Sequence, residues 1–125
     1  MLLDTQFLIE LERELDAGTA GPARHFLGSR RSTPVLVSTV SIGELAAGMN
    51  TNEATRRLVS RFRRVNLFTE VALAAAAVDR HLIGVGMRLG ENDTWLAGTA
   101  RYYGIPIVSN DDDFDRVPGL RRLRY

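Results

Sequence analysis

Residues 1–17, MLLDTQFLIELERELDA, predict that the chain begins with a short buried strand, an acid and then a helix. Met1–Leu3 is apolar, and Asp4 follows it directly. From Thr5 to about residue 17, the apolar residues at 7, 8, 11 and 15 share one helical face, and Gly18 marks the stop. A strand that runs directly into a helix is typical of an α/β protein.

The alternation of apolar β-branched runs and amphipathic segments continues along the chain. We expect further helices over residues 22–30, 41–48, 52–65, 71–89 and 92–103. We expect further strands over residues 35–37, 65–68, 105–109 and 120–124. With 125 residues and no linker, the sequence predicts a single domain, 1–125, of the α/β class. We expect three layers, with a mostly parallel central sheet of four or five short strands between helices.

The composition excludes several classes of site. The chain has no cysteine, so disulfides, thiolate zinc sites and cysteine nucleophiles are ruled out. Because an acid follows the first three residues, we expect no signal peptide. No apolar run reaches the roughly 18 residues of a membrane span, so we expect a cytoplasmic protein that does not bind membranes.

The formal net charge of +1 conceals a clustering of basic residues. All 16 basic side chains are arginines, and residues 24–64 hold eight of them against two glutamates. The predicted helix 52–65 presents Arg56, Arg57, Arg61, Arg63 and Arg64 on its outer face. Such a patch predicts contacts with RNA phosphates or with an acidic partner, although a solvated helix face explains it as well.

Four acids lie at the ends of predicted elements: Asp4, Glu44, Asp93 and Asp111. Asp4 closes the first strand, and Asp111 follows the strand predicted over residues 105–109. Each acid also has a local explanation, as a helix cap, a capping-box partner of Ser41, a dipole residue or a turn residue. In parallel sheets, however, sites form beyond the carboxyl ends of strands, so we expect these acids to meet.

Four converging carboxylates need protonation or a cation, because each pair about 4 Å apart repels by roughly 1–4 kcal/mol, depending on the dielectric. A site built only of oxygen ligands favours Mg²⁺ or Mn²⁺ over zinc or copper. Such an ion activates a bound water and neutralises charge on a phosphate oxygen. The acids therefore favour phosphodiester hydrolysis.

Four stretches resemble the motifs of PIN-domain proteins, especially the VapC-type toxins of bacterial toxin–antitoxin pairs. The stretches are LDTQFLI (3–9), STVSIGELAAG (38–48), NDTWLAGTA (92–100) and IVSNDDDF (107–114), the last followed by VPGL (117–120). They occur in the family's order and cover essentially the whole chain. The resemblance implies the PIN fold and endoribonuclease activity that depends on Mg²⁺ or Mn²⁺. It also implies a homodimer and inhibition by a VapB-type antitoxin.

The resemblance assigns the metal-binding, catalytic positions to Asp4, Glu44, Asp93 and Asp111. Thr5 and Ser109 match hydroxyl positions that support the acids. Asp112 is the alternative fourth acid, since Asp111, Asp112 and Asp113 are consecutive, but Asp111 has the family's spacing to Phe114. Trp95 is larger than usual at its position and is expected to contact substrate or partner.

Two other functions fit parts of this pattern. A catalytically silent PIN-like module would bind RNA or protein without cleavage, and the complete set of four acids argues against it. A phosphoacceptor α/β domain also gathers acids at strand ends. Sites of phosphoacceptor domains use a lysine to hold the phosphoryl group, and this chain has no lysine.

Overall fold

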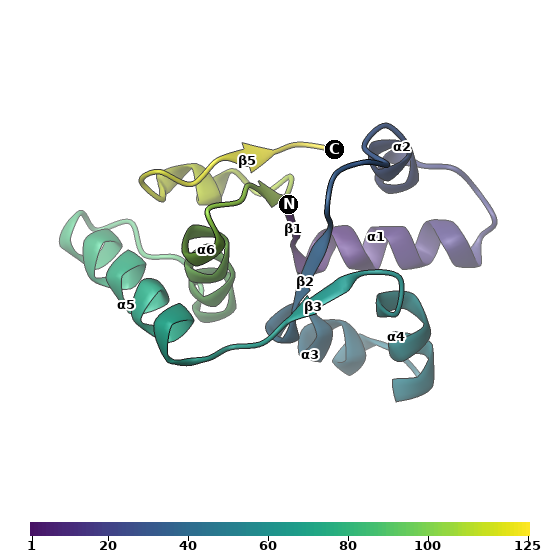
Figure 1. Ribbon diagram of the computed structural model, residues 1–125, viewed down its shortest axis with the longest axis horizontal. Coiled ribbons are helices and arrows are strands. Elements are labelled where there is room, and N and C mark those ends of the chain that lie inside the picture. Colours follow the sequence, from purple (N-terminus) through teal and green to yellow (C-terminus); the bar gives the residue numbers. More distant parts are fainter.

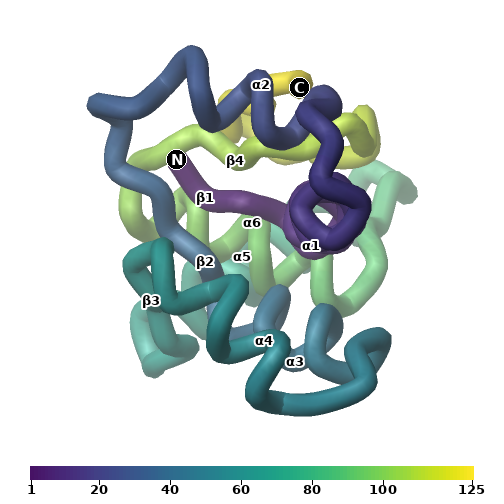
Figure 2. Tube along the Cα trace, turned by 90° about the vertical axis from the view of Figure 1, so that its right-hand side faces the viewer, coloured from purple at the N-terminus to yellow at the C-terminus, as the bar shows by residue number.

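Five short strands form one parallel sheet at the centre of the molecule, and the computed structural model describes residues 1–125 around it. The strands are β1 (Leu2–Leu3), β2 (Leu36–Ser38), β3 (Arg63–Val65), β4 (Ile107–Val108) and β5 (Arg122–Leu123). Their order across the sheet is β3-β2-β1-β4-β5, and every neighbouring pair is parallel. Figure 2 shows β4, β1, β2 and β3 following one another from top to bottom.

Helices cover both faces of this sheet, which confirms the three-layer α/β prediction. They are α1 (Thr5–Asp16), α2 (Pro22–Gly28), α3 (Thr39–Gly48), α4 (Asn52–Val59), α5 (Thr69–Gly84) and α6 (Glu91–Tyr103), with a short 3-10 helix, η1 (Asp112–Arg116). In Figure 1, α5 and α6 lie to the left of the strands, and α1, α2 and α4 to the right. None of these helices has the length and hydropathy needed to cross a membrane.

The alternating side chains of the central strands divide the core into two clusters. In β1, Leu3 packs with residues of α1 to α4, whereas Leu2 packs with residues of α5 and α6. In β4, Val108 and Ile107 divide in the same way. All four side chains are fully buried. A strand with both faces covered is apolar throughout, which is why these short runs were recognisable from the sequence.

Two predicted boundaries around the basic segment are wrong. Residues 63–65 form strand β3 and not the end of a helix, and α4 stops at Val59. The pairing of Val65 with Ser38 of β2 explains the change, because Val65 is buried there. Consequently Arg64 lies on the exposed edge strand, separate from Arg56 and Arg57 on α4.

Two further predictions concern helix ends. Ser38, and not Ser41, caps α3 by accepting a hydrogen bond from the Val40 amide at 3.2 Å, so the expected capping box is wrong. Helix α5 ends at Gly84 and not near Leu89, because the chain turns at Gly86 with φ of +70°. A positive φ is readily adopted only by glycine.

Helix α6 packs closely on α5 through one glycine. A Cβ atom added to Gly98 would lie 2.5 Å from backbone atoms of Ala75. Because backbone atoms have little freedom to move aside, residue 98 must lack a side chain for the two helices to pack as they do. This contact fixes the position of α6, whose first turn carries Asp93.

Candidate active site

Pairing of β1 with β4 brings the first and last acidic motifs together. Leu3 is in register with Val108, and the Asp4 amide extends the ladder by donating to the Val108 carbonyl oxygen at 3.2 Å. Asp4 and Ser109 therefore follow the ends of neighbouring parallel strands. This is the edge of the sheet where sites form in α/β proteins.

A pocket of about 470 Å³ opens at this edge. It is lined by Asp4, Thr5, Gln6, Ile9, Glu44, Asp93, Asp111 and Phe114. All four predicted acids thus line one pocket, although they are spread over more than a hundred residues of sequence. Asp112 does not line it, so the geometry favours Asp111 as the fourth acid of the pocket.

Asp4 is the most buried of these acids, with only 5% of its surface exposed. It caps α1, as its carboxylate accepts a hydrogen bond from the Phe7 amide at 2.7 Å. Asp4 is therefore both the cap of α1 and a member of the acid pocket. The Ser109 hydroxyl contacts the Asp4 carboxylate and also accepts from the Asp111 amide at 3.0 Å. Ser109 thus connects two of the four acids.

Glu44 is held at both of its carboxylate oxygens. The Thr5 hydroxyl donates to Oε2, and the Asn92 side-chain amide donates to Oε1 at 2.7 Å. The family resemblance implied a supporting role for Thr5 but gave Asn92 no role at the site. The cap residue of α6 is Gly90, and Asn92 lies within the first turn. Because Asn92 and Glu44 are 48 residues apart, no local pattern shows their contact.

Burial and mutual repulsion disturb the titration of this group. Burial raises the pKa of Asp4 to about 6, and the charges of Asp93 and Asp111 act in the same direction. Hydrogen bonds from Ser109 and Phe7 oppose the increase. Burial also raises the pKa of Asp93, with further increases from the charges of Asp111 and Glu44. The pocket thus favours a neutral or cation-bound group over free carboxylates.

No basic side chain forms a salt bridge with these four acids. The three salt bridges join Arg88 to Asp79, Arg116 to Asp113, and Arg122 to Asp115. None of them includes one of the four pocket acids. The oxygen-only donor set fits Mg²⁺ or Mn²⁺. As the side chains lie, however, no three acids or histidines are grouped closely enough to hold an ion.

The predicted basic contact residues lie outside the acid pocket. Arg56, Arg57, Arg61 and Arg64 are all exposed, and none of them lines it. Arg57 and Arg61 instead line a separate groove with Glu12 and Asp16 of α1. The predicted basic residues thus lie apart from the acid pocket and do not form one surface.

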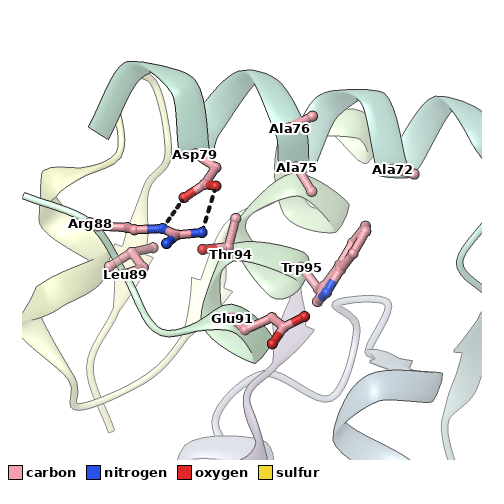
Figure 3. Close-up of a pocket in the computed structure, with 9 residues that line it drawn as sticks. All are labelled: Ala72, Ala75, Ala76, Asp79, Arg88, Leu89, Glu91, Thr94 and Trp95. Atoms are coloured by element: carbon pink, nitrogen blue, oxygen red, sulfur yellow. Dashed lines mark hydrogen bonds and ion pairs between the residues drawn. The ribbon is translucent and has the colours of Figure 1, made fainter. Parts of the chain in front are cut away.

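Trp95 also lies outside the acid pocket. It lines a neighbouring cavity of about 450 Å³ between α5 and α6. Figure 3 shows the Trp95 ring on one side of this cavity and the Arg88–Asp79 ion pair on the other. The first turn of α6 therefore separates two cavities, with Asp93 lining one and Glu91 the other.

Comparison with known proteins places the chain among relatives of similar architecture. It matches the PIN domain family over residues 1–120. Ribonuclease VapC4 of Mycobacterium tuberculosis is 33% identical over 93 residues, which cover 67% of this chain and 72% of that relative. Ribonuclease VapC5 of the same organism is 29% identical over 124 residues, covering 94% and 87% of the two chains.

Solved structures agree at the level of the fold. A chain from the DNA-bound crystal structure of VapBC2 from Rickettsia felis superimposes with a TM-score of 0.85. The alignment covers 99% of this chain and 97% of that one at 17% sequence identity. The family match covers nearly all residues, including the four motifs, and so the chain belongs to the PIN domain family.

Proposed function

We propose that this chain is a divalent-metal-dependent endoribonuclease and the toxin of a VapBC-type toxin–antitoxin pair. The observation that carries the proposal is the acid pocket, where Asp4, Glu44, Asp93 and Asp111 meet without a basic side chain. The relatives named ribonuclease VapC support the choice of RNA as substrate.

With their side chains drawn closer together, the four carboxylates would hold Mg²⁺ or Mn²⁺, which would supply an activated water and neutralise charge on the phosphate under attack. Ser109 and Thr5 orient Asp4 and Glu44 through their hydroxyl groups. Burial of Asp4 keeps water away from its carboxylate and strengthens its attraction to a cation. Asp111 completes the pocket from the β4–η1 turn.

We also propose a VapB-type antitoxin partner, a homodimer and a cytoplasmic location. The similarity to chains of VapBC complexes supports the antitoxin. An arginine from such a partner would find four unpaired carboxylates in the pocket and would compete there with a metal ion. The exposed arginines on α4 and β3 are candidate contacts for RNA or the partner.

The direct test is RNA cleavage by the purified chain, free of any partner, with Mg²⁺ or Mn²⁺ and with EDTA. We expect cleavage only with metal, and loss of cleavage in Asp4→Asn, which keeps an acceptor for the Phe7 amide. If the wild type cleaves no RNA with either metal, or Asp4→Asn cleaves equally well, the mechanism is wrong. RNA binding without cleavage would instead indicate the silent binding module.

The toxin role has a separate test in cells. We expect that expression of the chain alone arrests growth, and that co-expression of the small open reading frame next to its gene restores it. Asp93→Asn is the matched inactive control. Harmless expression of the wild type, together with no binding to the neighbouring product, would contradict the toxin role while leaving the nuclease chemistry open to the cleavage assay.

A further inference from the structure

We propose that Asn92 is a positioning residue for the acid pocket, whose amide holds Glu44 in place to bind a divalent cation. This inference rests on the proposed function, because it assigns Asn92 a role at the same metal site. It adds a polar residue that neither binds the ion nor lines the pocket.

The hydrogen bonds to Glu44 connect three segments of the fold. Thr5 directly follows Asp4, and Asn92 directly precedes Asp93. Each donor to the Glu44 carboxylate is therefore the chain neighbour of another pocket acid. Through Glu44 on α3, the start of α1 and the first turn of α6 are held at a fixed spacing.

Both donors are neutral, which matters for the chemistry. A carboxylate oxygen has two lone pairs, so one hydrogen bond to each oxygen leaves a second lone pair free for a cation. An arginine in the place of Asn92 would hold Glu44 equally well but would cancel its charge. The Asn92 amide restrains the side chain and preserves the negative charge that attracts the ion.

Without the hydrogen bond from Asn92, the Glu44 side chain would tend to move away from the pocket. Its side chain is only partly buried, and its charge acts repulsively on Asp93. A long, flexible carboxylate would then swing toward solvent in the metal-free protein. Hydrogen-bond partners that orient ligands in this way typically contribute about 10- to 100-fold to metal affinity.

The competing explanation is that Asn92 is an ordinary exposed residue at the start of a helix. Asn52 provides a matched control for this explanation. It is also an exposed asparagine in the first turn of a helix, α4, and it does not line the acid pocket. A merely structural role predicts similar effects of the same substitution at both positions.

The experiment measures the Kd for Mn²⁺ by calorimetry and the Tm in EDTA for partner-free protein. We expect Asn92→Leu to weaken Mn²⁺ binding by about 10- to 100-fold with little change in Tm. The Mn²⁺ concentration for half-maximal RNA cleavage should rise in the same proportion. Asn92→Gln, which keeps an amide donor, should recover part of the affinity, and Asn52→Leu should bind as the wild type does.

The outcomes separate this inference from the proposed function. If the wild type binds Mn²⁺ and Asn92→Leu binds it equally well, the role of Asn92 is wrong and the nuclease proposal stands. An equal loss in Asn52→Leu would also overturn it. If the wild type binds no Mn²⁺, both proposals fail. Should Asn92→Leu lower the Tm in EDTA, Asn92→Ser replaces it, because serine is well tolerated at helix starts, and the same criteria apply.

Discussion

Two sets of acids lie near the same edge of the sheet: acids paired with an arginine, such as Asp115, and the four unpaired acids of the pocket. Their electrostatic environments are opposite. Asp115 is exposed and forms a two-pronged ion pair with Arg122, with distances of 2.8 and 2.5 Å. The hydrogen bonds from Arg122 lower the pKa of Asp115. Asp4 is buried without a basic partner, and burial raises its pKa to about 6. A chain with 16 arginines has thus left four converging acids unpaired.

The difference separates structural acids from candidate catalytic acids. An ion pair satisfies an acid such as Asp115 within the fold, so nothing further is required of it. Unpaired and partly buried carboxylates cost stability, and perturbed groups of this kind cluster at functional sites. The lack of a partner is therefore more informative than the number of acids.

The largest effect is expected from Asp93→Asn. This change removes one carboxylate from the pocket, and we expect metal-dependent cleavage to fall at least about 100-fold, equivalent to about 2.7 kcal/mol of activation free energy. The Tm in EDTA should not fall, because the change relieves repulsion from Asp111 and Glu44. Cleavage rates and thermal unfolding measure the two effects.

Glu91→Gln is the matched control for this change, since Glu91 lies in the same turn of α6 but outside the acid pocket. We expect it to cleave as the wild type does. Equal losses in the two variants would mean that the charge of the α6 start, and not the pocket, determines activity.

The next largest effect is expected where α6 packs on α5, because this contact fixes the position of Asp93. In Gly98→Ala the added methyl group overlaps the Ala75 backbone, and we expect a loss of about 1–3 kcal/mol in unfolding free energy. Gly43→Ala on α3 is the control, because a Cβ there meets no atom within 4 Å. Chemical denaturation of the two variants compares them. A Gly98→Ala protein as stable as Gly43→Ala would contradict the close packing of the two helices.

The opposite pKa shifts predict opposite pH dependences. The pKa of Asp4 is about 6 when folded and about 3.9 when unfolded, so the folded state binds its proton more tightly. Metal-free protein should therefore gain about 2–3 kcal/mol from Asp4 as the pH falls from 8 to about 4. Asp115, with a lowered pKa, loses its contribution only below about pH 4.

Denaturation in EDTA across this pH range, with Asp4→Asn as the reference, isolates the contribution of Asp4. The difference in unfolding free energy between wild type and variant should shrink as the pH falls through 6. A difference that stays constant from pH 8 to pH 4 would show that the Asp4 carboxylate is not destabilised by burial.

The smallest effect is expected from Asp115→Asn. Loss of the ion pair leaves Arg122, whose side chain is only 4% exposed, with its bond to the Ser109 carbonyl oxygen at 3.3 Å. We expect a modest fall in Tm and unchanged cleavage with metal. A loss of cleavage as large as that of Asp93→Asn would remove the distinction between the two sets of acids.

Much of this arrangement was predictable from the sequence because its signals are local. The apolar runs at Leu2–Leu3 and Ile107–Val108 mark strands with both faces buried, and an acid follows each run closely. Parallel pairing then brings Asp4 and Asp111 to one edge. The left-handed conformation of Gly104, with φ of +62°, likewise ends α6 where the sequence predicted.

The remainder depends on contacts that no local pattern contains. Strand β3 presents exposed Arg63 and Arg64, which favour no strand, and only Val65 anchors it in the core. The Ser41–Glu44 spacing suggested a capping box, yet Glu44 turns to Thr5 and to Asn92. Tertiary hydrogen bonds override local spacing when they satisfy a charged group.

The consecutive acids Asp111, Asp112 and Asp113 permit the most direct test of the distinction. Only Asp111 lines the pocket, whereas Asp113 is paired with Arg116 and Asp112 is exposed outside the pocket. The measurement is the RNA cleavage rate, at saturating Mn²⁺, of the three single Asp→Asn variants. We expect Asp111→Asn to lose at least about 100-fold, or about 2.7 kcal/mol, while the other two cleave like the wild type. Equal losses in all three, or a loss confined to Asp112→Asn or Asp113→Asn, would contradict the assignment of the unpaired acids as the active site.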